Sequence, residues 1–419
     1  MIYDFVIFGG GIAGLYTAYK LHLQFPDKKI LLLEKEKRLG GRVETYRDKH
    51  MTVEAGAGRF SNKHHRLMKL IREFGLQSKV IEISSEMGYV DSGDKNHVVS
   101  ESPVNPLMAK IISASKTEPV DKLRAISFVD FANTVLGGKD TQLLLDSFGY
   151  YSELVIMNTY DSIRLIGKLT SQNRLYVLGG GLEQLIGRFI ECMGENDLVK
   201  LYTHKTVCAI QHMDYHQVFQ IHVSENVRPY LARVCISALP KQVMEGIEYF
   251  HPIRPLLKQI VCAPLCRIYS KFPKGADGKV WFSGLSKIAT NNNLRMIIPI
   301  SEEDGTIMIS YTDNKFANYW QRVYRDEGVV GVNRRLKKYI KQSLGIVIPE
   351  PTSTVVFYWS CGVGYWGVGS DSELVSREIV QPFGRSVPMF VCGEHVSANH
   401  QQWIEGALET SDAVIDKMV

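Results

Sequence analysis

The feature that most constrains the fold of this 419-residue chain is an apolar run followed by three spaced glycines. Residues 3–8 read YDFVIF, and glycines in the spacing GxGxxG follow directly. Apolar residues then recur at helical spacing, and residues 29–33 predict a second strand that ends at Glu34. A strand, a glycine turn, a helix, a second strand and an acidic residue in this order are typical of a dinucleotide site in an α/β fold.

Each residue of this layout has a physical role at such a site. Gly9 permits the tight turn, Gly11 lets a pyrophosphate approach the backbone, and Gly14 lets the helix pack on the strand. The first N–H groups of the helix favour phosphate, and Glu34 can accept hydrogen bonds from an adenosine ribose. A glycine-rich turn in an unrelated α/β fold is the alternative. The cofactor contacts predicted here are Gly9, Gly11, Ile12, Ala13, Gly14, Glu34 and Lys35.

Composition argues against several other classes of protein. No apolar run reaches the roughly 18 residues that a membrane span needs. The net charge of +5 comes without a Lys/Arg stripe, so nucleic acid is not an expected partner. The seven cysteines include no CxxC pair, so we expect no metal site. Several cysteines lie in apolar runs, which predicts reduced, mostly buried thiols and a cytoplasmic protein. The first strand is expected to begin by Tyr3, so we expect no signal peptide before it.

Two more segments point to the same cofactor from opposite ends of the chain. Residues 38–45 read RLGGRVET, and residues 390–407 read FVCGEHVSANHQQWIEGA. Both resemble FAD-contacting segments of the flavin amine oxidase superfamily. Residues 178–185, 206–210 and 234–240 resemble the second FAD segment of that superfamily. The resemblance implies FAD contacts at Gly40, Gly41, Arg42, Val207, Gly393, Glu394, Trp403 and Ile404.

The segment VEAGAGRFSNKHHRL, residues 53–67, places small residues directly before an arginine. The resemblance implies that Gly56, Ala57 and Gly58 let the backbone pass along the flavin ring. EAGAGRFSNKH is similar to the L-amino-acid oxidases, in which the residue matching Arg59 holds the substrate carboxylate. The planar fork of arginine suits a carboxylate. Alternatively, Arg59 bonds loop carbonyls or pairs with Glu54.

Three further positions complete the predicted catalytic set. Tyr311, in MISYTDNK, resembles the tyrosine that assists this carboxylate, and Trp403 matches the aromatic residue at the flavin face. Arg267, in LCRIYSKF, occupies the place of a lysine that aids the reaction with oxygen in many relatives. Because arginine does not give up a proton, this departure leaves a dehydrogenase with another electron acceptor as an alternative. A core position is the alternative for Tyr311. Cys361 lies too close to Trp359 to match the cysteine that links FAD covalently in some relatives.

These motifs imply a discontinuous fold. We expect a Rossmann-like, glutathione-reductase-like FAD domain from residues 1–66, 175–241 and 355–419. Residues 67–174 and 242–354 are expected to form an α+β substrate domain. Strands are predicted at 266–272 and 306–311, and helices alternate with turns over 121–174.

The resemblance implies an FAD-dependent oxidase of a C–N bond. Its substrate would be an amine or an L-amino acid, a hydride would pass to flavin N5, and oxygen would accept the electrons to give hydrogen peroxide. Oxidation of mono- or polyamines is the first alternative. A flavin dehydrogenase or desaturase and a flavoprotein without catalytic activity are the others. The predicted catalytic residues are Arg59, Arg267, Tyr311 and Trp403.

Overall fold

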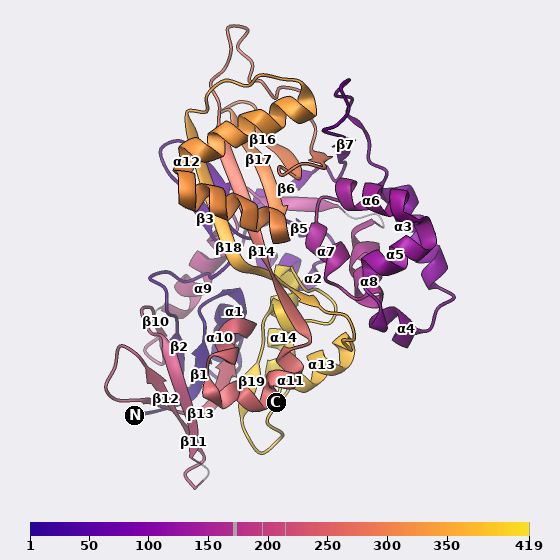
Figure 1. Ribbon diagram of the computed structural model, residues 1–419. Coiled ribbons are helices and arrows are strands. Elements are labelled where there is room, and N and C mark those ends of the chain that lie inside the picture. The colour runs from indigo at the N-terminus through magenta and orange to yellow at the C-terminus, as the bar shows by residue number, and fades with distance from the viewer. Residues whose placement is uncertain (171–173, 195, 214, 419) are drawn as a thin grey trace.

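The computed structural model describes residues 1–170, 174–194, 196–213 and 215–418, shown in Figure 1. Its lower part holds a sheet of the strands β1 (Ile2–Phe8), β2 (Ile30–Leu33), β10 (Val199–Tyr202), β11 (Val207–Met213), β12 (Val218–Val223), β13 (Tyr230–Ser237) and β19 (Met389–Val391). The strand order is β10-β2-β1-β13-β12-β11, with β19 also on β13. β10, β2, β1, β13 and β19 pair in parallel, whereas β12 is antiparallel to both β11 and β13.

Helices cover both faces of this sheet because its strands are apolar on both sides. All four residues of β2 are buried, as expected for a parallel strand between two layers. In β1, Phe5 and Ile7 pack toward one helical layer, and Val6 and Phe8 toward the other. The first layer consists of α1 (Ile12–Gln24), α2 (His65–Glu73), α9 (Gln184–Gly194) and α14 (Ile404–Ile415). The second consists of α10 (Lys241–Glu245), η2 (Glu248–Ile253), α11 (Arg254–Leu257) and α13 (Ser372–Ile379).

A second, mainly antiparallel sheet lies above the first in Figure 1. In spatial order its strands are β18 (Ser353–Trp366), β14 (Ile260–Lys271), β17 (Thr306–Asp313), β16 (Met296–Ser301), β15 (Ile288–Thr290), β7 (Gly88–Val90) and β8 (Ser100–Glu101). The long helix α12 (Asn314–Leu344) packs on this sheet through Ala317, Trp320 and Leu336, and its regular geometry breaks at Gly328. The predicted strand at 306–311 falls within β17, and the one at 266–272 lies in β14 except for its last residue, which confirms both.

A group of helices with its own apolar core lies beside the second sheet. It consists of α3 (Val104–Ser115), α4 (Val120–Ala125), α5 (Phe128–Leu136), α6 (Gly138–Ser147), α7 (Tyr151–Val155) and α8 (Thr159–Thr170). The helices predicted over 121–174 are therefore present among the described residues. The remaining short elements are β3 (Thr45–Arg47), β4 (Thr52–Glu54), β5 (Phe60–Ser61), β6 (Val80–Ile83), β9 (Leu175–Leu178), η1 (Gln77–Lys79) and η3 (Glu394–Val396).

The sheets refine the predicted domain limits, while the division into two domains stays a proposal. β18 was expected in the FAD domain, but it pairs along its length with β14 of the second sheet. Conversely, Leu67, Leu70 and Ile71 of α2, expected in the substrate domain, pack with the core of the first sheet. The sequence patterns of β18 and α2 show that one face is apolar, but they do not show which sheet that face covers.

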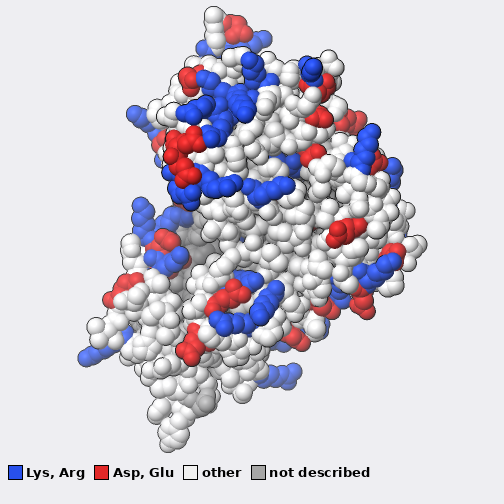
Figure 2. All heavy atoms as spheres, viewed as in Figure 1, with Lys and Arg blue, Asp and Glu red and all other residues white. Residues whose placement is uncertain are grey.

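Lys and Arg residues are not distributed evenly over the surface of the protein. Figure 2 shows Lys and Arg gathered on the upper part of this face, over α12. The basic residues of this helix are Lys315, Arg322, Arg325, Arg334, Arg335, Lys337, Lys338 and Lys341. Glu327 and Glu350 pair with Arg335 and Lys337 and offset part of this charge. Within the described ranges, the helices are too short or too polar to cross a membrane.

Candidate active site

The glycine turn between β1 and α1 has the geometry that the sequence pattern predicts. Gly9 has a φ of +97°, which favours glycine. A Cβ on Gly14 would lie 2.0 Å from the Gly9 carbonyl oxygen, so helix and turn pack too closely for any side chain there. A Cβ on Gly11 would meet only Gly41, at 3.9 Å. Gly11 is therefore the glycine that a ligand can approach.

Glu34 is held at the end of β2 beside this turn. Its carboxylate accepts hydrogen bonds from the Gly10 N–H at 2.7 Å and the Glu36 N–H at 2.8 Å. The Lys205 N–H donates to the Glu34 carbonyl at 2.8 Å, so the chain that leads to Val207 passes next to it. Lys35 is exposed and pairs with Glu36 at 3.4 Å. Glu34 and Val207 thus belong to one neighbourhood, as an adenosine site requires.

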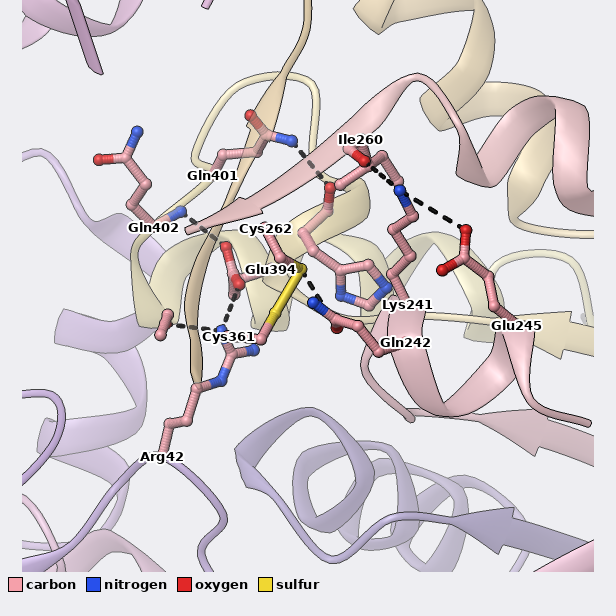
Figure 3. The surroundings of a disulfide bond; sticks show 12 residues. Arg42, Lys241, Gln242, Glu245, Ile260, Cys262, Cys361, Glu394, Gln401 and Gln402 are labelled. Atoms are coloured by element: carbon pink, nitrogen blue, oxygen red, sulfur yellow. Dashed lines mark hydrogen bonds and ion pairs between the residues drawn. A yellow bond between two sulfur atoms is a disulfide. The ribbon is translucent and has the colours of Figure 1, made fainter. Parts of the chain in front are cut away.

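The second predicted segment lies against the first. The Gly40 N–H donates to the Gly10 carbonyl at 2.8 Å, and a Cβ on Gly41 would lie 3.0 Å from the Cα of Gly11. Arg42 forms an ion pair with Glu394 and donates to the Gly362 carbonyl at 2.9 Å, as Figure 3 shows around Arg42. The structure therefore joins the motifs from the two ends of the chain.

The C-terminal motif ends at the start of α14. Gly393 has a φ of +139°, and the buried Glu394 also accepts from the Gln402 N–H at 2.7 Å. Trp403 is the N-cap residue of α14, and Ile404, its first residue, is buried.

The small residues at 56–58 have contacts that the sequence did not predict. A Cβ on Gly56 would lie 1.9 Å from the Arg42 carbonyl oxygen. A Cβ on Gly58 would lie 3.0 Å from the Arg267 guanidinium. The Ala57 N–H donates to the Arg42 carbonyl at 2.8 Å. Close packing of the protein alone thus requires glycine at Gly56, whereas the passage of a flavin along this segment stays a prediction.

Arg59, Arg267, Tyr311 and Trp403 come together in one cluster. The Arg59 guanidinium lies 5.9 Å from the centre of the Trp403 ring, and the Arg267 guanidinium lies 4.8 Å from the centre of the Tyr311 ring. Tyr150 connects the two pairs. Its hydroxyl accepts a hydrogen bond from Arg59, and its ring packs edge-on against Tyr311 with 5.7 Å between ring centres.

The two arginines sit in different electrostatic surroundings. Burial lowers the pKa of Arg59 from its ordinary value and Arg267 acts the same way, while Tyr311 and Glu153 oppose them. Burial also acts against the charge of Arg267, but Tyr311 and neighbouring groups raise its pKa overall. Arg267 donates to the Glu54 carbonyl at 3.0 Å. Arg267 is thus tied to the protein, whereas Arg59 offers a charge in need of an anionic partner.

Of the aromatic and histidine side chains near this cluster, some pack against its residues and others belong to the apolar core. Tyr365 packs with Trp403 in a small apolar cluster, whereas Trp366 lies in the core of the first sheet and donates to the Ser397 carbonyl. His64 and His395 are both buried. His64 packs on Trp403 with 4.7 Å between ring centres. Burial lowers the pKa of His395 to about 4, so this ring is neutral at pH 7.

Sequence reasoning missed Tyr150, Glu153 and Asp313. Tyr150 and Glu153 flank the start of α7, in a segment without a recognised motif. Asp313 follows Tyr311 by two residues in β17, so both side chains face the same side of that strand. This spacing is a signal that could have identified Asp313. Nothing in the local pattern distinguishes Tyr150 or Glu153 from an ordinary helix start.

The prediction of reduced cysteines is wrong for one pair. Cys262 and Cys361 form a disulfide between β14 and β18, beside Arg42 and Glu394 (Figure 3). Their separation of 99 residues in sequence hides the contact, which arises only from the pairing of the two strands. The disulfide removes the reason for expecting a cytoplasmic protein. It also occupies the Cys361 thiol, which agrees with the prediction that this cysteine does not link a flavin.

Replacing Cys361 with serine is expected to lower the free energy of unfolding by about 2–5 kcal/mol, because the bridge restricts the unfolded chain. Urea denaturation checks this, with Cys192→Ser, at an exposed free thiol, as the matched control. Reduction by dithiothreitol should lower the urea midpoint of the wild type to that of Cys361→Ser. If neither the substitution nor the reduction changes the urea midpoint, the bridge contributes nothing to stability.

The residues around the glycine turn fit FAD. The N-cap residue of α1 is Gly11, which has no side chain to cap the first N–H groups of the helix, and such N–H groups favour phosphate. Ser237 Oγ, at the end of β13, and His395 Nε2 are buried and have no hydrogen-bond partner within the described part of the chain. They lie near the carboxyl ends of the parallel strands, where dinucleotides bind in such sheets.

Comparison with known proteins identifies the family. Residues 7–74 match the NAD(P)-binding Rossmann-like domain, and residues 107–414 match the family described as flavin containing amine oxidoreductase. The chain belongs to the flavin-containing amine oxidoreductase family. It is accordingly an oxidoreductase of the amine oxidase type with a Rossmann-like domain, and its cofactor is FAD.

Similar proteins within this family differ in their named substrates. The chain is 20% identical to uncharacterized protein R188 of Acanthamoeba polyphaga mimivirus, over 99% of this chain and 93% of that protein. It is 26% identical to L-amino acid oxidase Cdc18 of Crotalus durissus cumanensis, over 60% of this chain and 55% of the oxidase. A mutant of putrescine oxidase has a similar fold, with a TM-score of 0.77 and 15% identity over 100% of this chain and 99% of that structure.

Proposed function

We propose that the protein oxidises the C–N bond of an L-amino acid, with oxygen as electron acceptor and hydrogen peroxide as product. The observation that carries this proposal is the position of Arg59. Its guanidinium lies among Tyr150, Trp403 and Tyr311, where burial disfavours an unpaired positive charge. A substrate carboxylate would supply the missing negative charge and match the arginine fork. The similarity to L-amino acid oxidases supports this assignment.

The residues of the cluster have distinct roles in this proposal. Arg59 binds the carboxylate, and Tyr150 holds the guanidinium in place. Trp403 and Tyr365 flank the substrate amine and exclude water from it. When bound, FAD accepts the hydride from the substrate carbon. The chain supplies orientation and electrostatic stabilisation, and a neutral amine requires no general base.

Anaerobic reduction of the flavin tests the substrate class. We expect pooled L-amino acids to bleach the oxidised flavin spectrum, because they carry the carboxylate that Arg59 binds. Pooled mono- and polyamines should bleach it far more slowly, and dithionite provides the control for complete reduction. Bleaching by amines alone would overturn the proposal and assign Arg59 a structural role.

Arg267 makes the electron acceptor a separate question. Its guanidinium is bound to the Glu54 carbonyl and stays charged, so it can stabilise a reduced-oxygen anion but cannot donate a proton to it. Oxygen consumption after reduction by the substrate tests this part. Fast reoxidation by a quinone or dye with slow reoxidation by oxygen would favour a dehydrogenase instead.

A further inference from the structure

A buried carboxyl group near Arg59 has an oxygen atom without a hydrogen bond among the described residues. Glu153, the third residue of α7, is 4% exposed, and its Oε2 has no hydrogen-bond partner in the described ranges of the chain. The charges of Asp313 and Arg59 both act on its pKa, in opposite directions. An unpaired buried carboxyl group is costly, so proteins usually provide a hydrogen bond or an opposite charge for it.

The neighbouring groups do not fill this role. The Asp313 carboxylate already accepts from the Tyr151 N–H at 3.1 Å and the Ser152 N–H at 2.8 Å, and its own negative charge repels that of Glu153. Arg59 donates to Tyr150. Two carboxyl groups therefore act on each other within this cluster, and Glu153 Oε2 lacks a hydrogen-bond partner among the described residues.

We infer that Glu153 binds a second cationic group of the substrate, which makes the substrate an L-amino acid with a basic side chain. This inference rests on the proposed function, in which Arg59 binds the α-carboxylate. A substrate that carries a carboxylate and a distal ammonium or guanidinium group matches Arg59 and Glu153 together. A neutral side chain would leave Glu153 unpaired, and so Glu153 determines specificity.

The ionisation of Glu153 gives this inference a pH dependence. Burial, and after it the charge of Asp313, raise the pKa of Glu153 against the opposing effect of Arg59, and the net result is a pKa of about 8. Tyr365 also acts on this group, and burial raises the pKa of Tyr365 well above its ordinary value, so its hydroxyl adds no charge at neutral pH. A cationic side chain binds the ionised carboxylate, so kcat/KM for a basic amino acid should rise as pH increases through about 8.

L-lysine and L-norleucine are the probes that isolate this effect, because they differ chiefly in the side-chain ammonium. Both carry the same α-amino group, so its titration largely cancels in the ratio of their kcat/KM values. The wild-type enzyme is expected to prefer L-lysine, and this preference should grow between pH 7 and pH 9. In Glu153→Gln we expect the preference to fall by about 100-fold, as for other buried charge pairs, and to become independent of pH.

The exposed Glu101 supplies a matched control, Glu101→Gln, which should retain the wild-type ratio. A wild-type enzyme that prefers L-norleucine, or a Glu153→Gln variant that loses activity on both substrates equally, would overturn the inference and leave the proposed function intact. Because the wild-type ratio needs no variant, poor folding of Glu153→Gln would not prevent the test. Reduction by 1,4-diaminobutane without reduction by any amino acid would overturn the proposed function as well.

Discussion

Gly14→Ala is expected to destabilise the protein by about 3 kcal/mol, as for other overpacked sites, although alanine favours helices. The reason is the distance of 2.0 Å between the new Cβ and the Gly9 carbonyl oxygen, which forces α1 away from the turn. Thermal unfolding of the purified protein measures this loss. FAD content per chain should fall with it, because the glycine turn and the first N–H groups of α1 move together.

Gly11→Ala is the matched control, and it separates packing from cofactor binding. Gly11 has a φ of −71°, which alanine adopts, and the new Cβ would be 3.9 Å from its nearest neighbour, an ordinary contact. We therefore expect unfolding of the FAD-free protein to change by less than about 1 kcal/mol. FAD affinity should fall by about 100-fold, because the methyl group lies where the pyrophosphate approaches. Wild-type FAD affinity in Gly11→Ala would show that the phosphates bind elsewhere.

The glycine turn also shows what the sequence can predict. Its residues are local in sequence, and the positive φ of Gly9 and the contact of Gly14 with the Gly9 carbonyl both arise within the turn. The ends of β1 and β2 follow from apolar periodicity and fall within one residue of the predicted 3–8 and 29–33. The joining of Arg42 to Glu394 was predictable too, because both motifs belong to one recognisable cofactor pattern.

The remainder of the site depends on contacts that no local pattern encodes. Tyr150 reaches Arg59 because the helical group packs against the second sheet, and α7 carries no motif. Cys262 and Cys361 meet through strand pairing across 99 residues of sequence. The resemblance explained the small residue Gly56 by a flavin that passes along the backbone, but the Arg42 carbonyl by itself requires glycine there. The need for a small or charged residue at a position was thus easier to predict than the residues that contact it in the fold.

Arg59→Lys is expected to lower kcat/KM for L-amino acids by about 100-fold, because lysine keeps the charge but loses the fork that binds a carboxylate through two hydrogen bonds. The loss should appear mainly as a higher KM, because a carboxylate contact that is equally strong in the ground state and the transition state leaves kcat unchanged. Arg72→Lys, at an exposed position on α2, is the matched control.

The informative comparison for Arg59→Lys is between an L-amino acid and the amine that lacks only its carboxylate. If Arg59 binds the carboxylate, the variant loses its preference for the amino acid while the slow reduction by the amine stays unchanged. If Arg59 is structural, both rates and the FAD content fall together, because Arg59 then supports Tyr150 and Trp403 rather than the substrate. The ratio of the two rates therefore separates recognition of the substrate from support of the fold.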